Sequence, residues 1–111
     1  SNEQYQFQED KSCAVGCKQD VKKGKASILC QLGDKVQEYE VEIEKINLSS
    51  EDNKGMEIHV TDPELLKKAG GIVQGMSGAP LLQDGKCIGA VTHVFVRDVT
   101  RGYATFLENM L

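Results

Sequence analysis

Residues 75–96 have the sequence GMSGAPLLQDGKCIGAVTHVFV, which gives the clearest indication of the fold. Two largely apolar runs, at 80–83 and 86–96, flank the dipeptide Asp84-Gly85. Aspartate and glycine tolerate the positive φ angles that a two-residue turn between antiparallel strands requires. We therefore expect a compact β-hairpin over residues 80–96.

Further strands are expected outside this hairpin. Their strand-like sequences occupy residues 25–32, 36–46, 56–60 and 103–107. Gly33-Asp34 predicts a turn between the first two, and residues 97–102 a turn before the last. Val41-Glu42-Ile43-Glu44 alternates strictly between apolar and acidic residues, which is typical of a strand with one face in water.

One helix is predicted over residues 61–70, TDPELLKKAG. Asp62 is a favourable N-cap residue, and Pro63 suits the first helical position because an N–H there would have no partner. The lysines and Gly70 mark the carboxyl end. We expect a helix of about two turns.

The chain of 111 residues suits a single domain. Strands with one short helix predict a mainly β fold, a small antiparallel β-barrel. The order of loop, strand, glycine-containing turn and strand in residues 75–96 resembles one half of a chymotrypsin-like (trypsin-like) double barrel. Residues 1–11 are polar and show no periodicity, so we expect a flexible segment there and the domain over residues 12–111.

Composition excludes some classes of function. The net charge is −4, and lysines and arginines are scattered, which argues against a nucleic-acid-binding surface. The longest apolar run, residues 87–96, is too short to span a bilayer.

The four cysteines are Cys13, Cys17, Cys30 and Cys87. The spacing of the first two is a weak metal motif because the other two do not repeat it, and we expect neither a metal nor a cofactor. We expect Cys30 and Cys87 to act as small, half-buried hydrophobic residues in strands. A disulfide between Cys13 and Cys17 is the alternative if the protein is located in an oxidising compartment.

The loop Gly75-Met76-Ser77-Gly78-Ala79-Pro80 contains the candidate catalytic residue, Ser77. A nucleophilic serine needs exposure, a base, and amide donors for the developing oxyanion. Gly75 and Gly78 permit a sharp turn that exposes Ser77, and the N–H groups of Gly75 and Ser77 can then form an oxyanion hole. The alternative is a plain turn between a helix and a strand.

Longer motifs add a closer resemblance. They are TDPELL (61–66), GGIVQGMSGAP (70–80) and GKCIGAVTHVFV (85–96), with a match also at the carboxyl end. These runs resemble the peptidase of the stage IV sporulation protein B family, the forespore-secreted serine proteases of endospore-forming bacteria. The resemblance covers about residues 21–111 and implies that the chain is the C-terminal part of the peptidase domain.

The resemblance implies a serine endopeptidase that signals during sporulation. Such a protein is exported from the forespore into the space between its inner and outer membranes. There it cleaves a regulatory subunit of a membrane-embedded protease complex, which leads to activation of a late mother-cell sigma factor, and it also cleaves itself. A membrane anchor, a PDZ domain and the other half of the peptidase are expected upstream in the full-length protein.

Three residues match functional positions of the family. Ser77 matches the nucleophile, Asp62 the proposed acidic partner, and Thr92 a further position implicated in activity. Asp62 has an equally good account as the helix N-cap. Thr92 either lines the substrate groove or is simply a good strand former.

The family's general-base histidine lies in an upstream Gly-His motif that is not in this sequence. The histidines here are His59, which can orient toward Asp62, and His93, which we expect to line the core or a groove. We therefore expect the nucleophile and oxyanion hole without the base, and little or no hydrolysis by this chain alone. The alternatives are a non-catalytic β domain that binds peptides by strand addition, and a β domain in which Ser77 only occupies a turn.

Overall fold

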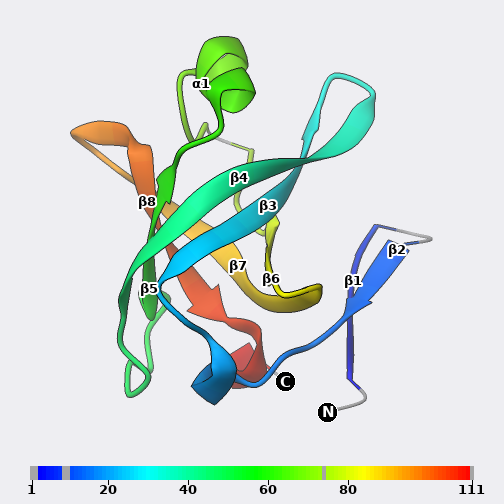
Figure 1. Cartoon of the computed structure of the whole chain (residues 1–111), viewed down its shortest axis with the longest axis vertical. Coiled ribbons are helices and arrows are strands. Elements are labelled where there is room, and N and C mark those ends of the chain that lie inside the picture. The colour runs from blue at the N-terminus through cyan, green and yellow to red at the C-terminus, as the bar shows by residue number, and fades with distance from the viewer. Residues whose placement is uncertain (1–2, 9–10, 74, 111) are drawn as a thin grey trace.

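A computed structural model describes residues 3–8, 11–73 and 75–110. These residues form strands, one α-helix and two 3-10 helices (Figure 1). In chain order the elements are β1 (Gln4–Gln8), β2 (Lys11–Ala14), η1 (Lys18–Asp20), β3 (Gly24–Leu32), β4 (Lys35–Ile46), β5 (Met56–Val60), α1 (Pro63–Ala69), β6 (Pro80–Gln83), β7 (Lys86–Phe95), β8 (Asp98–Phe106) and η2 (Leu107–Met110).

The strands β3 to β8 close into an antiparallel barrel in the order β3-β4-β5-β8-β7-β6. β3, β4 and β5 form one meander, and β6, β7 and β8 form a second. The meanders join where β5 pairs with β8 and where β3 pairs with β6. The predicted mainly β fold, a small antiparallel barrel with one helix, is confirmed.

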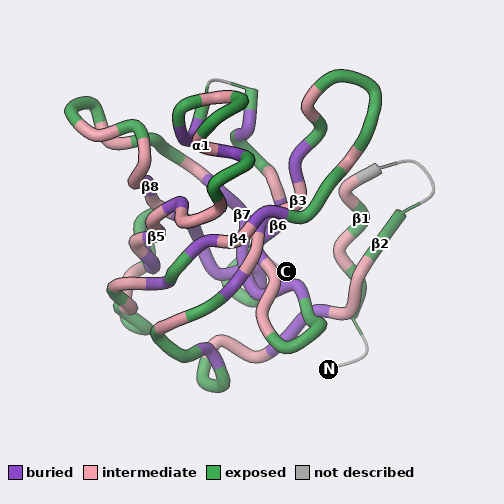
Figure 2. Tube along the Cα trace, turned by 45° about the horizontal axis from the view of Figure 1, so that its top comes forward, coloured by how far each residue is buried: buried purple, intermediate pink, exposed green. Residues whose placement is uncertain are grey.

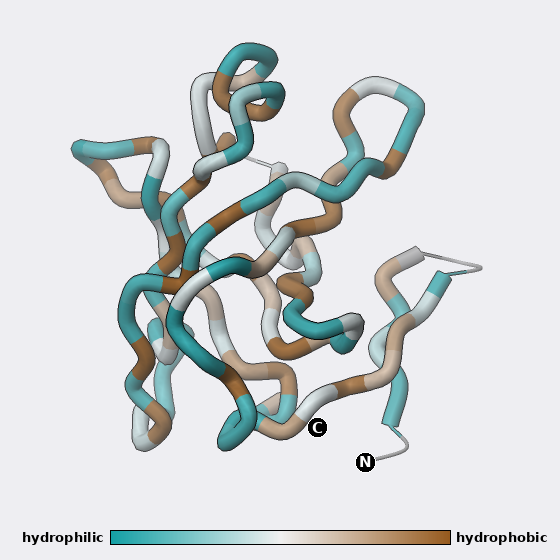
Figure 3. The backbone as a smooth tube through the Cα atoms, in the orientation of Figure 1, coloured by the Kyte–Doolittle hydropathy of each residue, from teal (hydrophilic) through white to brown (hydrophobic). Residues whose placement is uncertain are grey.

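The barrel strands carry buried residues that form its core, and Figure 2 colours these positions along the backbone. On β4, Tyr39, Val41 and Ile43 are buried, and the residues between them face outward at least in part. Hydrophobic and hydrophilic residues therefore alternate along this strand (Figure 3). The predicted alternation is confirmed because the period of two places one face of the strand in the core.

The predicted helix is present as α1, over Pro63–Ala69. Asp62 caps its first turn, and Gly70 ends it with a left-handed φ of 77° while its N–H donates to Leu66 O. Leu65 is fully buried against the barrel core. Local capping and one buried side chain thus fix the helix at one end of the barrel (Figure 1).

The last strand is longer than the sequence predicts. β8 begins at Asp98, so the turn expected over residues 97–102 is wrong for most of that segment. A Cβ atom at Gly102 would lie 2.5 Å from the backbone oxygen of His93. Glycine at this position therefore permits close packing of β8 on β7 and does not mark a turn.

β1 and β2 form a hairpin beside the barrel (Figure 1), which the sequence does not predict. A strand over Gln4–Gln8 lies inside the segment where we expected only flexible chain. The hairpin packs against a second apolar cluster through Tyr5 and Cys13. The buried members of this cluster are Val15, Cys87, Ala90 and Leu107. This tertiary contact gives the segment its structure. The sequence does not indicate it, because the residues of the segment are mainly polar. The proposed domain boundary at residue 12 stays a prediction.

A disulfide joins Cys13 of β2 to Cys87 of β7, with 5.8 Å between their Cα atoms. The Cys13–Cys17 alternative is therefore wrong, and Cys17 is free. Cys87 is buried, but it is a disulfide partner and not merely a small hydrophobic residue. Cys30 is free and lies in a strand among hydrophobic residues, as predicted, but it is buried and not half-buried, and burial raises the pKa of its thiol to about 11.

Candidate functional site

Ser77 lies on a tight loop between α1 and β6. The φ angles of 101° at Gly75 and 88° at Gly78 fall in the left-handed region, which glycine adopts without strain. Met76 is only 5% exposed and anchors the loop in the core, whereas Ser77 is exposed. The glycine-bracketed turn predicted from the sequence is present and leaves the Ser77 hydroxyl accessible.

Backbone hydrogen bonds fix this loop against β7. Gly78 N–H donates to Val91 O (2.7 Å), and Val91 N–H donates to Ala79 O (2.9 Å). Within the loop, Met76 N–H donates to Val73 O (3.1 Å) and Ala79 N–H donates to Met76 O (2.9 Å). The pairing of β6 with β7 thus continues as far as the residue that follows Ser77.

Two N–H groups of the loop are not used in this way. Neither Gly75 N–H nor Ser77 N–H donates a hydrogen bond to any residue that the structure describes. Both residues line the same two surface hollows. Available backbone donors beside an exposed serine are what an oxyanion hole requires.

Ser77 lies between two hollows of about 340 and 390 Å³. The first extends to the tip of the β3–β4 hairpin and is bordered by Phe7, Leu29 and Leu32. The second is bordered by Ile72 and Val94. Among the described residues, no Asp, Glu, Lys or Arg lines either hollow. The second hollow is mainly apolar and suits an apolar side chain of a bound peptide, whereas the first exposes polar and apolar surface about equally.

The Ser77 hydroxyl donates a hydrogen bond to the backbone oxygen of Thr92, at 3.1 Å. It makes no hydrogen bond to either histidine in the described part of the chain. His93 lies on β7 and borders the second hollow together with Ser77, as a groove-lining residue. His59 lies on β5, with its Nδ1 atom 3.7 Å from a carboxylate oxygen of Glu44. The contact between His59 and Asp62 that the sequence allows is not observed.

Asp62 has both carboxylate oxygens occupied by backbone donors. Oδ2 accepts from Glu40 N–H (2.9 Å), and Oδ1 accepts from Glu64 N–H (2.9 Å) and Leu65 N–H (3.4 Å). The hydrogen bond from Glu40, followed by those from the helix, lowers the pKa of the Asp62 carboxyl. Asp62 borders neither hollow at Ser77. The N-cap interpretation is confirmed, and the role as acidic partner stays a prediction.

Replacing Asp62 with alanine is expected to lower the free energy of unfolding by about 1–2 kcal/mol, since the helix loses its cap. Asp62→Asn keeps an acceptor oxygen and should lose less. Because the folded-state pKa is depressed, the contribution of the ionised carboxylate is complete above the unfolded-state pKa and is lost as pH falls through the folded-state pKa. Urea denaturation between neutral and acidic pH measures both effects. Equal stability of wild type and Asp62→Ala at neutral pH would contradict the capping role.

Thr92 contributes both its backbone and its side chain to this region. Its Oγ1 atom lies 2.6 Å from Asn53 O and 3.2 Å from Tyr103 O, and it can donate its proton to either. Its backbone oxygen accepts from Ser77, and the residue borders the second hollow. Thr92 therefore ties β7 to neighbouring segments next to Ser77, and its part in substrate binding stays a prediction.

We expect Thr92→Val to lower the free energy of unfolding by about 1 kcal/mol, because the isosteric change removes a hydrogen bond to Asn53 or Tyr103. Thr92→Ser retains the hydroxyl and serves as the matched control. Chemical denaturation of both variants makes the comparison. If Thr92→Val loses peptidase activity at wild-type stability, the hydroxyl acts on the substrate and its structural role is wrong.

The residues that border the first hollow from outside the Ser77 loop were not predicted as site residues. They include Phe7 of β1, together with Leu29 and Leu32 of β3. No local motif marks such residues, because only the closure of the barrel and the docking of the hairpin bring them to Ser77.

Within residues 3–8, 11–73 and 75–110, no group of three or more His, Cys, Asp or Glu side chains is arranged to hold a metal ion. In the same residues, no helix has the length and apolar character needed to cross a membrane.

Comparison with known proteins shows the family to which the chain belongs. Neither the curated proteins nor the solved structures gave a significant match. The model of one family, described as SpoIVB peptidase S55, matches residues 1–111, which is the whole chain and includes the Ser77 loop. This protein therefore belongs to the SpoIVB peptidase S55 family, a family of peptidases.

Proposed function

We propose that this chain is the nucleophile-bearing part of a serine endopeptidase, with Ser77 as the nucleophile. One observation carries the proposal: Ser77 is exposed between two hollows that no described charged residue lines, and the N–H groups of Gly75 and of Ser77 itself donate to no described residue. A peptide placed across the loop can thus set its carbonyl oxygen against these donors.

Each group has a defined part in the proposed reaction. Ser77 Oγ attacks the carbonyl carbon of the scissile bond while a general base takes the hydroxyl proton. The N–H groups of Gly75 and Ser77 donate to the carbonyl oxygen as it becomes negative, each contributing a factor on the order of 10² or more in rate. The base then gives its proton to the departing amine, which leaves an ester on Ser77, and water hydrolyses this ester by the same steps.

The general base is proposed to come from a part of the protein outside this chain. The Ser77 hydroxyl donates to Thr92 O and not to an imidazole, and His59 lies beside Glu44. A base that approaches Ser77 would replace Thr92 O as the acceptor. This chain alone should therefore hydrolyse peptides slowly or not at all.

A chymotrypsin-like arrangement is part of the proposal. The Ser77 loop is followed by β6, the Asp84-Gly85 turn and β7, which is the order expected for the closing half of such a double barrel. The other half, placed upstream, would then face the hollows and supply the base. The order of these elements along the chain and the closure of the barrel support this part of the proposal.

The biological context of the proposal rests on family membership and on the resemblance described above. We propose a peptidase that is secreted from the forespore, cleaves itself, and signals in sporulation by cutting a regulatory subunit of a membrane protease complex. An upstream peptidase half, a PDZ domain and a membrane anchor complete the proposed full-length protein.

A fluorophosphonate probe tests the catalytic proposal on the full-length protein, because it labels an activated serine and spares a turn serine. Mass spectrometry should locate the label at Ser77. The same experiment on His93→Gln locates the base, since loss of labelling as complete as in Ser77→Ala would assign the base to His93. Tight peptide binding without any labelling would favour the non-catalytic binding module.

A further inference from the structure

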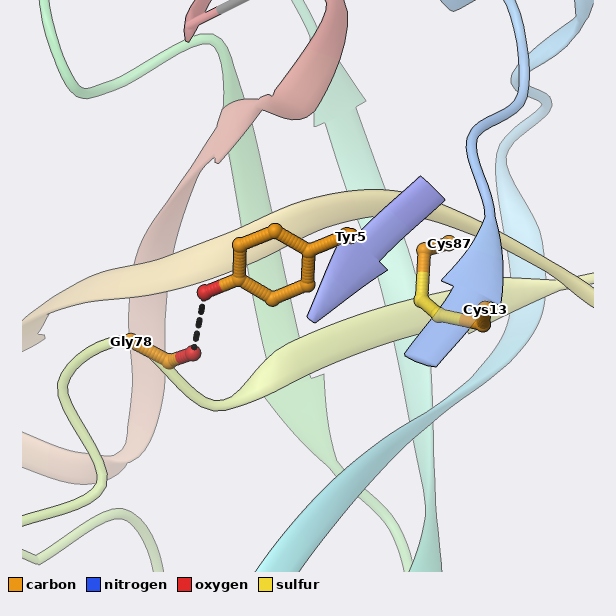
Figure 4. Close-up of a disulfide and its surroundings, with 4 residues drawn as sticks. All are labelled: Tyr5, Cys13, Gly78 and Cys87. Carbon is orange, nitrogen blue, oxygen red and sulfur yellow. Dashed lines mark hydrogen bonds between the residues drawn. A yellow bond between two sulfur atoms is a disulfide. The ribbon is translucent and has the colours of Figure 1, made fainter. Parts of the chain in front are cut away.

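The amino-terminal hairpin contacts the catalytic loop directly. Tyr5 Oη of β1 donates a hydrogen bond to the backbone oxygen of Gly78 at 3.2 Å (Figure 4). Gly78 is the residue that follows Ser77, and Tyr5 lies 73 positions away from it in the chain. Phe7, two residues after Tyr5, borders the first hollow beside Ser77. The hairpin thus forms one side of the candidate active site.

The disulfide holds this hairpin in place. Cys13 pairs with Tyr5 across the hairpin and is covalently bonded to Cys87 on β7 (Figure 4). Just beyond Cys13, Val15 N–H donates to Glu3 O (2.8 Å) and Gly16 N–H donates to Cys87 O (2.9 Å). The Tyr5 ring packs on the buried cluster that contains Cys87. Tyr5 therefore packs on the barrel itself, and the neighbouring residues 13–16 are joined to β7 by the disulfide and by a backbone hydrogen bond.

Gly78 needs such a constraint. Its φ of 88° and the empty space around a Cβ placed there show that its own side of the loop has no packing to restrict it. β7 holds its N–H through Val91 O, and Tyr5 holds its carbonyl oxygen. The hydrogen bonds described above for the Ser77 loop are formed with β7 or within the loop and the residues just before it. Tyr5 adds one from the amino-terminal hairpin. The two peptide groups on either side of the Gly78 Cα atom are thus each held by a hydrogen bond, one with β7 and one with Tyr5.

We propose that Tyr5 is a positioning residue for the nucleophile loop, held in place by the Cys13–Cys87 disulfide. The inference rests on the proposed catalytic role of Ser77. Tyr5 touches no reacting atom, and it acts through Gly78 by setting the direction of the loop that presents Ser77 and its oxyanion donors. Because small displacements of a catalytic group lower the rate of the chemical step, its loss should reduce kcat and leave KM nearly unchanged.

The first test replaces Tyr5 with phenylalanine in the full-length peptidase, which removes the hydroxyl and keeps the ring. The kcat and the rate of fluorophosphonate labelling at Ser77 should fall about three- to tenfold, the change expected for one ordinary hydrogen bond. Tyr39→Phe is the matched control, since Tyr39 donates to Gln37 and borders neither hollow. It should label at the wild-type rate. Equal rates for Tyr5→Phe and wild type, both labelled, would overturn the positioning role.

A second test is independent of activity. This chain contains two Gly-Ala pairs, Gly78-Ala79 and Gly89-Ala90, so selective carbonyl labelling of glycine and nitrogen labelling of alanine gives two correlated NMR signals. Tyr5→Phe should displace the Gly78 carbonyl resonance and leave Gly89 in place. An unmoved Gly78 signal overturns the inference, even if wild-type protein resists the probe and the proposed catalytic function has failed.

A third test examines the disulfide. Cys13→Ser combined with Cys87→Ala should slow labelling of Ser77 by a similar factor, and adding Tyr5→Phe to this variant should cause little further loss. Such non-additivity is expected if the disulfide acts through Tyr5. Fully additive losses would show that the disulfide does not position the loop through this side chain.

Discussion

Replacing Ser77 with alanine is expected to abolish probe labelling and to lower kcat of the full-length peptidase by roughly 10⁴-fold or more. The change removes the single atom that forms the ester intermediate. The oxyanion donors remain, since they belong to the backbone of Gly75 and of residue 77 itself. Residual activity should therefore not exceed what a positioned water can achieve in the same site.

This loss should not come from unfolding. Ser77 is exposed and its hydroxyl makes one hydrogen bond, to Thr92 O, so the free energy of unfolding should change by only about 0.5 kcal/mol. Ser27→Ala is a matched control, because Ser27 loses a hydroxyl bonded to Glu38 outside the site. Cleavage of a peptide substrate and thermal unfolding are measured on both variants. A Ser77→Ala protein that retains more than a few per cent of wild-type kcat would contradict the serine mechanism.

Removal of the disulfide by Cys13→Ser should lower the free energy of unfolding by roughly 3–4 kcal/mol. The bond closes a loop with a sequence separation of 74, and a cross-link of this length strongly restricts the unfolded chain. Cys87 is fully buried, so its freed thiol remains in an apolar environment that suits it. Guanidinium unfolding under oxidising conditions measures the loss.

The control for this variant is Cys17→Ser, which changes a half-buried cysteine that is free. Its stability should stay close to that of wild type, and a reducing agent should lower the stability of both wild type and Cys17→Ser but not that of Cys13→Ser. If reduction leaves wild-type stability unchanged, the disulfide does not contribute to the fold as described.

Local patterns in the sequence were sufficient for most of the barrel. The Asp84-Gly85 turn, the alternation around Val41 and the capping residues Asp62 and Gly70 all predicted elements that the structure contains. Each of these depends on a few neighbouring residues and on the period of a strand or helix. β8 is the exception, since Gly102 indicates a turn locally but is required by close contact with His93 on the neighbouring strand.

The features of the candidate site also fall into those that local sequence predicts and those that depend on tertiary contacts. By itself the sequence determined the exposed serine between two glycines, because the conformational freedom of glycine is a local property. The N–H groups next to Ser77 belong to the same turn, so the sequence predicts them together with it. Only the tertiary structure decided that Cys13 pairs with Cys87, that Tyr5 reaches Gly78, and that the second carboxylate oxygen of Asp62 accepts from Glu40 N–H. The first two contacts join residues more than 70 positions apart. No spacing rule encodes such contacts, because they arise when barrel closure and hairpin docking bury a shared apolar surface.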